Sequence, residues 1–391
     1  MNGIARQLTS AAIMALSTLC TTAVRAQDDG DAHRNAYTVT RLVSDIAGAA
    51  TNQDPLLQNA WGVAFSPAGS PFWLNDNVTG CSTLYDGAGA ASALQVKIPL
   101  PGNVVAPATC KHVDPNSPPS LTPAAPTGIV WNPSGKFLVP GTKIQASFIF
   151  ATEDGTISAW GGGLTPFDTA VIAADNSANP TAANGAVYKA LVFAVNVKGA
   201  FLFATNFRAG TIDVFSPTGP GGTYVLTTTD GGFTDPAIPA GYAPFGIQNI
   251  DGDLFVTYAK QNAQKHDDAA GPGNGFVDVF DTDGHLLRRF ASRGALNSPW
   301  AVARASSNFG AFSGAILVGN FGDGRINAYD RHGRFLDAVE DENGQPIVID
   351  GLWTLALGGG LHSSPDTLFF SAGPNHETDG LFGTITPLHL D

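Results

Sequence analysis

The chain has 391 residues, of which 43% are hydrophobic and 14% charged, and it contains 46 glycines and 26 prolines. This composition excludes an intrinsically disordered chain, because disordered chains have few hydrophobic residues and a high density of charge. The net charge of -13 argues against nucleic acids and anionic membranes as partners, since both are negatively charged and would be repelled.

The first 26 residues predict a secretory signal peptide. Arg6 precedes an apolar stretch from Ala11 to Cys20, and the sequence AVRA ends at Ala26, which is the usual three-part pattern of such a signal. We therefore expect an exported protein, periplasmic or extracellular, with a polar leader over residues 27–36. No later segment contains about 18 uninterrupted apolar residues, so the sequence predicts no integral membrane segment.

Residues 37–43 (YTVTRLV) are predicted to form a strand, and six repeats follow it. Each repeat contains short runs rich in Val, Ile, Phe, Tyr and Trp, and Gly, Pro, Asn and Asp separate these runs, which is typical of strands and turns. The first run of each repeat carries a small residue, and the spacings between these positions are 66, 62, 56, 55 and 53 residues: Gly62, Gly128, Ala190, Gly246, Ala301 and Thr354. A strand repeat of this length predicts a propeller or a solenoid.

The last repeat lacks a fourth strand. Five repeats have a recognisable fourth strand, whereas the sixth reaches the end of the chain soon after its third strand, LFGTI (381–385). If residues 37–43 pair with that strand, the ring closes and no unpaired edge remains. The sequence therefore predicts an all-β fold, a six-bladed β-propeller of four-stranded blades over residues 37–391, closed by the N-terminal strand.

Two cysteines, Cys81 and Cys110, lie outside the predicted signal peptide. An even number of cysteines in an exported protein favours a disulfide. In a four-stranded blade, the loop between the second and third strands and the connection between blades emerge on one face, which we call the top face. Because the two cysteines lie in such segments, we expect them to pair, and two buried free thiols are the alternative.

Candidate functional residues gather in the loops of the top face. His266 and His376 are candidate catalytic bases, and five residues are candidate metal ligands: His112, Glu153, Asp267, Asp268 and Glu377. Carboxylate oxygens suit calcium, whereas imidazole together with carboxylate suits zinc, copper or iron. Four other polar residues lie in turns of this face: Asp154, Asn206, Asn320 and Asp323. The alternative to a functional role is that they form ordinary hydrogen bonds to the backbone of their turns.

Other residues of the top face predict ligand contacts. Lys260 and Arg208 are candidates for binding an anion, with a solvated or ion-paired cation as the alternative. Phe207, Tyr242 and Phe321 are candidate aromatic contacts for a small molecule, a glycan or an exported protein. The long insertion 260–275 in the fourth repeat is unusual in a compact hairpin and is typical of functional loops.

Four segments of the chain resemble an exported family of conserved hypothetical propeller proteins associated with the PEP-CTERM sorting system. These segments are NFRAGTIDVF (206–215), YAKQNAQKHDD (258–268), GNGFVDVFD (273–281) and VGNFGDGRINAYD (318–330). The likeness spans about residues 37–386. Unlike some members of that family, the chain ends at LHLD, without a hydrophobic sorting tail.

The repeats also resemble, more distantly, NHL repeats and the gluconolactonase-like propellers. In the lactonase-like group a divalent ion over the channel polarises the substrate carbonyl. In this chain Glu153, Asn206 and Asp350 are candidate ligands by their chemistry, although no residue-by-residue match to the motif of that group supports them. Because one fold hosts many functions, two hypotheses stay open. One is a binding module with an acidic top face, and the other is a metal-dependent hydrolase or lyase with His266 or His376 as its base.

Overall fold

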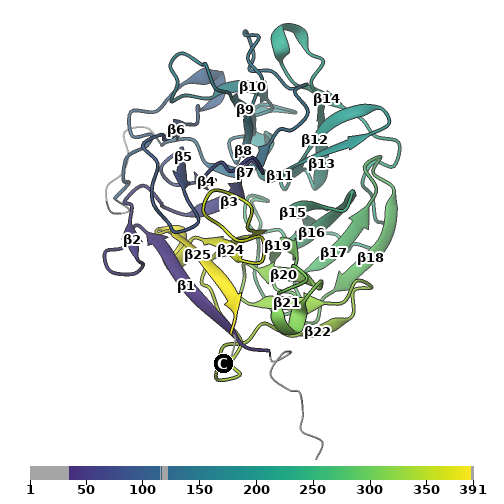
Figure 1. The fold of residues 1–391 in the computed structure, drawn as a ribbon. Coiled ribbons are helices and arrows are strands. Elements are labelled where there is room, and N and C mark those ends of the chain that lie inside the picture. Colours follow the sequence, from purple (N-terminus) through teal and green to yellow (C-terminus); the bar gives the residue numbers. More distant parts are fainter. Residues whose placement is uncertain (1–34, 115, 117–121, 389–391) are drawn as a thin grey trace, which may run out of the picture.

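The computed structural model describes residues 35–388, except 115 and 117–121. The predicted signal peptide (1–26) and most of the predicted leader lie outside the described residues. The strands form six sheets that are arranged as a ring around a central axis (Figure 1). The prediction of an all-β, six-bladed propeller is therefore confirmed. Within the described ranges, no helix is long and apolar enough to cross a membrane.

Five blades are built from four consecutive antiparallel strands. Blade 1 contains β3 (Ala60–Ala64), β4 (Phe72–Asp76), β5 (Cys81–Tyr85) and β6 (Val96–Lys97), and blade 2 contains β7 (Pro126–Trp131), β8 (Phe148–Thr152), β9 (Thr156–Trp160) and β10 (Val171–Asp175). Blade 3 contains β11 (Tyr188–Asn196), β12 (Gly199–Asn206), β13 (Thr211–Ser216) and β14 (Val225–Thr227). Blade 4 contains β15 (Tyr242–Ile250), β16 (Asp253–Lys260), β17 (Phe276–Phe280) and β18 (Leu286–Ser292), and blade 5 contains β19 (Pro299–Arg304), β20 (Ile316–Asn320), β21 (Ile326–Tyr329) and β22 (Phe335–Ala338).

The sixth blade joins the two ends of the propeller. It contains β23 (Leu352–Leu357), β24 (Leu368–Ala372), β25 (Leu381–Pro387) and, as its outer strand, β1 (Tyr37–Ser44). The register of β1 on β25 runs antiparallel from Tyr37 opposite Pro387 to Ser44 opposite Leu381, and Figure 1 shows the purple strand beside the yellow one. The short strand β2 (Asn52–Gln53) adds a parallel pairing outside β1. The predicted N-terminal closure agrees with this sheet.

The recurring small residue lets neighbouring blades approach one another. A Cβ atom on Gly62 would lie 2.4 Å from the carbonyl oxygen of Thr127 in the next inner strand, and one on Gly246 would lie 1.9 Å from that of Trp300. Both distances are too short for real contacts, so these positions have no room for a side chain. In these repeats the glycine is thus a packing requirement of the ring.

We expect Gly246→Ala to destabilise the protein by about 1–3 kcal/mol, because the added methyl group forces the inner strands of blades 4 and 5 apart. The measurement is urea unfolding followed by circular dichroism. Gly162→Ala is the matched control, since a Cβ at Gly162 meets nothing within 4 Å. Equal stability of the two variants would show that the inner strands are not packed at their closest approach.

The predicted disulfide between Cys81 and Cys110 is confirmed. Cys81 begins β5, whereas Cys110 lies in the connection from blade 1 to blade 2, and their Cα atoms are 5.2 Å apart. The backbone N–H of Cys110 also donates to the carbonyl oxygen of Thr79 at 2.9 Å. The disulfide therefore anchors the first part of this connection to the top of blade 1.

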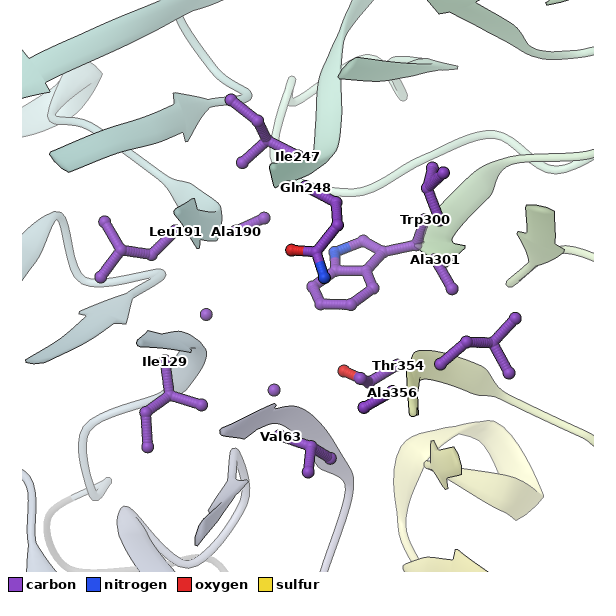
Figure 2. Close-up of a pocket in the computed structure, with 14 residues that line it drawn as sticks. Val63, Ile129, Ala190, Leu191, Ile247, Gln248, Trp300, Ala301, Thr354 and Ala356 are labelled. Carbon is purple, nitrogen blue, oxygen red and sulfur yellow. The ribbon is translucent and has the colours of Figure 1, made fainter. Parts of the chain in front are cut away.

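The six inner strands surround a narrow central channel, which Figure 2 shows in close-up. The channel contains a cavity of about 60 Å³ that is lined mostly by small and aliphatic side chains, such as Ile129 and Ala190. The side chains of Gln248 and Trp300 reach toward its centre (Figure 2). The channel is therefore nearly filled at this level, and a ligand larger than a few atoms does not fit inside it.

Candidate functional site

Aromatic side chains lie above this cavity, at the top of the channel. In each inner strand the residue immediately before the small one belongs to this layer, and the six residues are Trp61, Thr127, Lys189, Phe245, Trp300 and Trp353. The rings of Trp61 and Trp353 stack with centroids 3.5 Å apart, and Trp300 packs edge-on against both. Because these rings come from blades 1, 5 and 6, they close much of the channel.

Lys189 is the charged member of this layer. Its side chain is only 2% exposed, and its Nζ atom lies 5.1 Å from the centroid of the Trp61 ring. The ammonium group donates a hydrogen bond to Glu153 Oε1, and it lies 3.1 Å from Asp267 Oδ1. Burial alone would lower the pKa of Lys189, but the negative charges of Glu153 and Asp267 outweigh this effect and raise it. The buried lysine is therefore charged.

We call Glu153, Lys189, His266, Asp267 and Glu377 the mouth cluster. Glu153 lies in the loop between β8 and β9, and His266 and Asp267 lie in the long loop between β16 and β17. The Nδ1 atom of His266 lies 2.8 Å from Asp267 Oδ1 and 4.0 Å from Glu153 Oε1. The hydrogen bond from His266, together with the charge of Lys189, holds the pKa of Asp267 well below its usual range. Each of Glu153, His266 and Asp267 offers one potential ligand atom, and these three atoms lie within 4.8 Å of one another.

Glu377 reaches the cluster from blade 6. Asn59 donates from Nδ2 to Glu377 Oε2 at 2.9 Å, and the Oδ1 atom of Asn59 accepts a hydrogen bond from Trp353 Nε1 at 2.9 Å. This second bond fixes the orientation of the Asn59 amide, so its N–H group has to face Glu377. Burial and the nearby charge of Glu153 raise the pKa of Glu377 to about 7. The cluster thus contains a carboxyl group that titrates near neutral pH.

The backbone that carries Glu377 is strained. Three consecutive residues, Asn375, His376 and Glu377, have φ angles of 55°, 57° and 65°, in the left-handed region that favours glycine. Such a conformation costs roughly 1–2 kcal/mol per residue. The turn is held by Asp350 Oδ2, which accepts from the Asn375 N–H at 2.9 Å, and by Asp379 Oδ2, which accepts from Asn375 Nδ2 at 2.6 Å. Strain of this kind gathers at functional sites.

Several predicted ligands lie apart from this cluster or have other partners. The Nδ2 atom of Asn206 donates to Asp213 at 3.0 Å, so this side chain serves its own turn. Asp350 supports the strained turn. His112 is exposed, with Nδ1 3.2 Å from the Pro55 carbonyl oxygen, and His376 is exposed beside Glu377. Asp268 follows Asp267 in the long loop, and burial raises the pKa of its carboxyl group.

The alternative interpretation of the turn residues agrees with their contacts. Asp154 Oδ2 accepts a hydrogen bond from the backbone N–H of Ala125 at 2.8 Å. Asn320 donates to the Ala295 carbonyl oxygen at 2.8 Å and to Asp323 Oδ1 at 3.0 Å. These side chains therefore hold loops of the top face in place.

The predicted ligand-contacting residues occupy different environments. Phe207 was expected at the surface, but its side chain is 0% exposed, because it packs beneath Lys189 and against Phe245. Phe321 is partly exposed and stacks on Trp353 at 4.0 Å. The other three lie farther out: the Tyr242 hydroxyl donates to Asn274 at 3.0 Å, Arg208 donates to the Gly185 carbonyl oxygen at 3.0 Å, and Lys260 is exposed at the end of β16.

Lys189 and Asn59 are site residues that the sequence interpretation missed. Lys189 lies in an apolar strand, YKALVFAVN, which we interpreted only as a repeat opening. A signal was present, because the corresponding residue of four other repeats is tryptophan or phenylalanine. A lone cation at such a position requires a buried partner. Asn59 gave no comparable signal.

Comparison with solved structures finds proteins of low sequence identity to this chain. A gluconolactonase from Xanthomonas campestris is 14% identical, with 85% of this chain and 88% of that chain covered and a TM-score of 0.46. A luciferin-regenerating enzyme is 12% identical, with 90% of this chain and 96% of that chain covered and a TM-score of 0.48.

Sequence comparison finds nearer relatives, although no family model matches the chain. "Uncharacterized protein R648" of Acanthamoeba polyphaga mimivirus is 32% identical over 352 residues, which cover 89% of this chain and 80% of the relative. "Uncharacterized protein L690" of the same virus is 31% identical over 358 residues, which cover 89% of this chain and 85% of the relative. The chain therefore belongs to the same protein family as these two mimivirus proteins.

Proposed function

We propose that the protein binds a small neutral or cationic molecule at the mouth cluster. The supporting observation is that ionisable side chains from blades 2, 3, 4 and 6 converge where the channel is blocked. The cluster sets three carboxyl groups against one buried ammonium group, so an anionic ligand is disfavoured. Asp267 is 58% exposed and His266 36%, and both offer polar atoms to a ligand. Hydrogen-bond donors on the ligand suit these carboxylates, because each carboxylate oxygen can accept more than one hydrogen bond.

The test is calorimetric titration with three sugars of similar size and different charge, in the presence of a chelator. We expect binding of glucosamine and glucose, and no binding of gluconate. Loss of one charge-assisted hydrogen bond in Asp267→Asn should weaken the binding by about tenfold or more. Asp230→Asn is the control, because Asp230 forms an exposed ion pair with Lys198. Binding that is unchanged in Asp267→Asn, or strongest for gluconate, would contradict the proposal.

The raised pKa of Glu377 predicts a pH dependence of stability. A carboxyl group whose pKa rises from 4.5 to about 7 on folding stabilises the protein below pH 4.5, and this contribution disappears as the pH rises through about 7. Glu377→Gln lacks this titration. Between pH 5 and 9, the free energy of unfolding of the native protein should therefore fall by about 2 kcal/mol more than that of the variant. Urea unfolding at both pH values measures the difference, and parallel behaviour of the two proteins would contradict it.

The alternative proposal is a metal-dependent hydrolase or lyase that uses a divalent ion such as calcium. Its support is the set of donors from Glu153, His266 and Asp267, which are of the types that divalent ions take. However, the ammonium group of Lys189 already contacts two of these donors. In this proposal His376 is the candidate base, because an imidazole of His266 that coordinates the ion has no lone pair left to accept a proton. Metal analysis of the purified protein tests it, because the binding proposed above requires no metal.

The place of action is part of the same proposal. A disulfide persists in oxidising compartments, which supports export to the periplasm or the extracellular space. The ligand would then be a molecule of that compartment, either free, on a glycan or on another exported protein. The link to the PEP-CTERM sorting system stays a prediction from the sequence.

A further inference from the structure

The position of Lys189 within the ring bears on whether the mouth can hold a metal ion. Its Nζ atom lies between the aromatic layer and the carboxylates, 5.1 Å from the centroid of the Trp61 ring and 5.9 Å from that of Phe207. Aromatic faces attract a cation, and the effect is larger for a desolvated one. The layer below and the carboxylates above therefore both favour positive charge at this point.

The ammonium group uses the same atoms that a metal ion would use. It contacts Glu153 Oε1 and Asp267 Oδ1, and the third donor of the set, His266 Nδ1, is already 2.8 Å from Asp267 Oδ1. A divalent ion bound to these oxygens would lie about 2.0–2.6 Å from each of them. It would then sit beside a buried, charged ammonium group, where the repulsion is strong because little water screens it.

Asn77 further reduces the acceptors left for a metal ion. Glu153 has a second oxygen, Oε2, and Asn77 donates to it from Nδ2 at 3.1 Å. Both oxygens of Glu153 are thus engaged by protein donors. The donor types suit a metal ion, but their present partners do not leave room for one.

We propose that Lys189 is the resident cation of the mouth cluster and that it excludes divalent metal ions from the site. The inference rests on the mouth cluster being the binding site proposed above. It makes Lys189 a specificity-determining residue, and it assigns the site to ligands that are recognised by hydrogen bonds with His266, Asp267 and Glu377. It also separates this chain from propellers that carry a divalent ion over their channel.

Replacing Lys189 with methionine tests the inference. Methionine keeps most of the volume of the buried side chain but removes the charge, so Glu153, His266 and Asp267 become available to an ion. Terbium is a suitable probe, because a nearby tryptophan sensitises its luminescence and Trp61 lies in the layer below. We expect Lys189→Met to bind terbium at least about tenfold more tightly than the native protein.

A second substitution separates the mouth from other acidic surfaces. Adding Asp267→Asn to Lys189→Met should remove the gain in luminescence, whereas adding Asp230→Asn should leave it. Equal terbium affinity of the native protein and Lys189→Met would overturn the inference. Binding of terbium or zinc by the native protein that is lost in Asp267→Asn would also overturn it. This second test does not require Lys189→Met to fold.

The outcomes distinguish this inference from the proposed function. Sugar binding in the presence of a chelator, together with metal binding by the native protein at Asp267, would remove the role of Lys189 and keep the ligand site. Absence of sugar binding, together with terbium binding only in Lys189→Met, would keep the role of Lys189 and remove the ligand proposal.

Discussion

A chain that begins at residue 47 is expected to lose its cooperative fold, because it lacks β1. Tyr37, Leu42 and Val43 of that strand are buried, and the Tyr37 hydroxyl donates to the Phe309 carbonyl oxygen in blade 5 at 2.9 Å. Burial of three such side chains contributes roughly 5–9 kcal/mol, which is comparable with the whole stability of an ordinary domain. The loss also exposes the edge of β25 to pairing with other chains.

Circular dichroism, urea unfolding and light scattering measure this effect. A chain that begins at Asn35 is the control, since it keeps every contact described for β1. Tyr37→Ala provides a graded version and should lose about 3 kcal/mol, within the usual range for removing a buried aromatic ring. A cooperative transition of native midpoint in the chain that begins at residue 47 would show that β1 is dispensable for the sixth blade.

The second large effect is expected from Glu153→Gln. Lys189 is only 2% exposed, so removal of its main partner leaves a buried charge with the partly exposed Asp267 alone. Breaking a buried ion pair on one side costs about 3–5 kcal/mol, and we expect about 3 kcal/mol because Asp267 remains. Urea unfolding at pH 7 measures the loss.

The double variant Glu153→Gln, Lys189→Met tests the cause of that loss. Replacing both members of a buried ion pair is often close to neutral, so the double variant should recover most of the stability. An additive loss in the double variant would show that Glu153 stabilises the top face through other contacts, such as its hydrogen bond with Asn77. The cycle thereby measures the interaction between the two charges.

The fold was predictable from the sequence because each repeat contains the same pattern of short apolar strands, with one small residue in the first strand. Closure was predictable as well, since residues 37–43 were the strand left over and the last repeat lacked one. The bounds of the outer strands of the blades were harder to predict. In the first repeat the fourth strand-like run is LQVKI (94–98), but only Val96 and Lys97 of this run form β6.

The candidate site was predictable only as a face of the molecule. Strand order places Glu153, His266 and Glu377 in loops of the top face, but their approach depends on loop conformations that the sequence pattern does not specify. The three residues of the left-handed turn at Glu377 are not glycines, so the sequence did not predict this turn. Lys189 was missed because strands are recognised by their apolar residues. Lys189 is a charged residue in such a strand, and it lies at the centre of the site.

The shared sixth blade also constrains when the protein can acquire its native shape. The pairing of Tyr37 with Pro387 joins positions about 350 residues apart, so the contact forms only after synthesis has passed residue 387. Contacts of such long sequence separation slow folding, because much chain entropy is lost before they form. During synthesis the ring therefore stays open, and any binding pocket that requires blade 6 forms last.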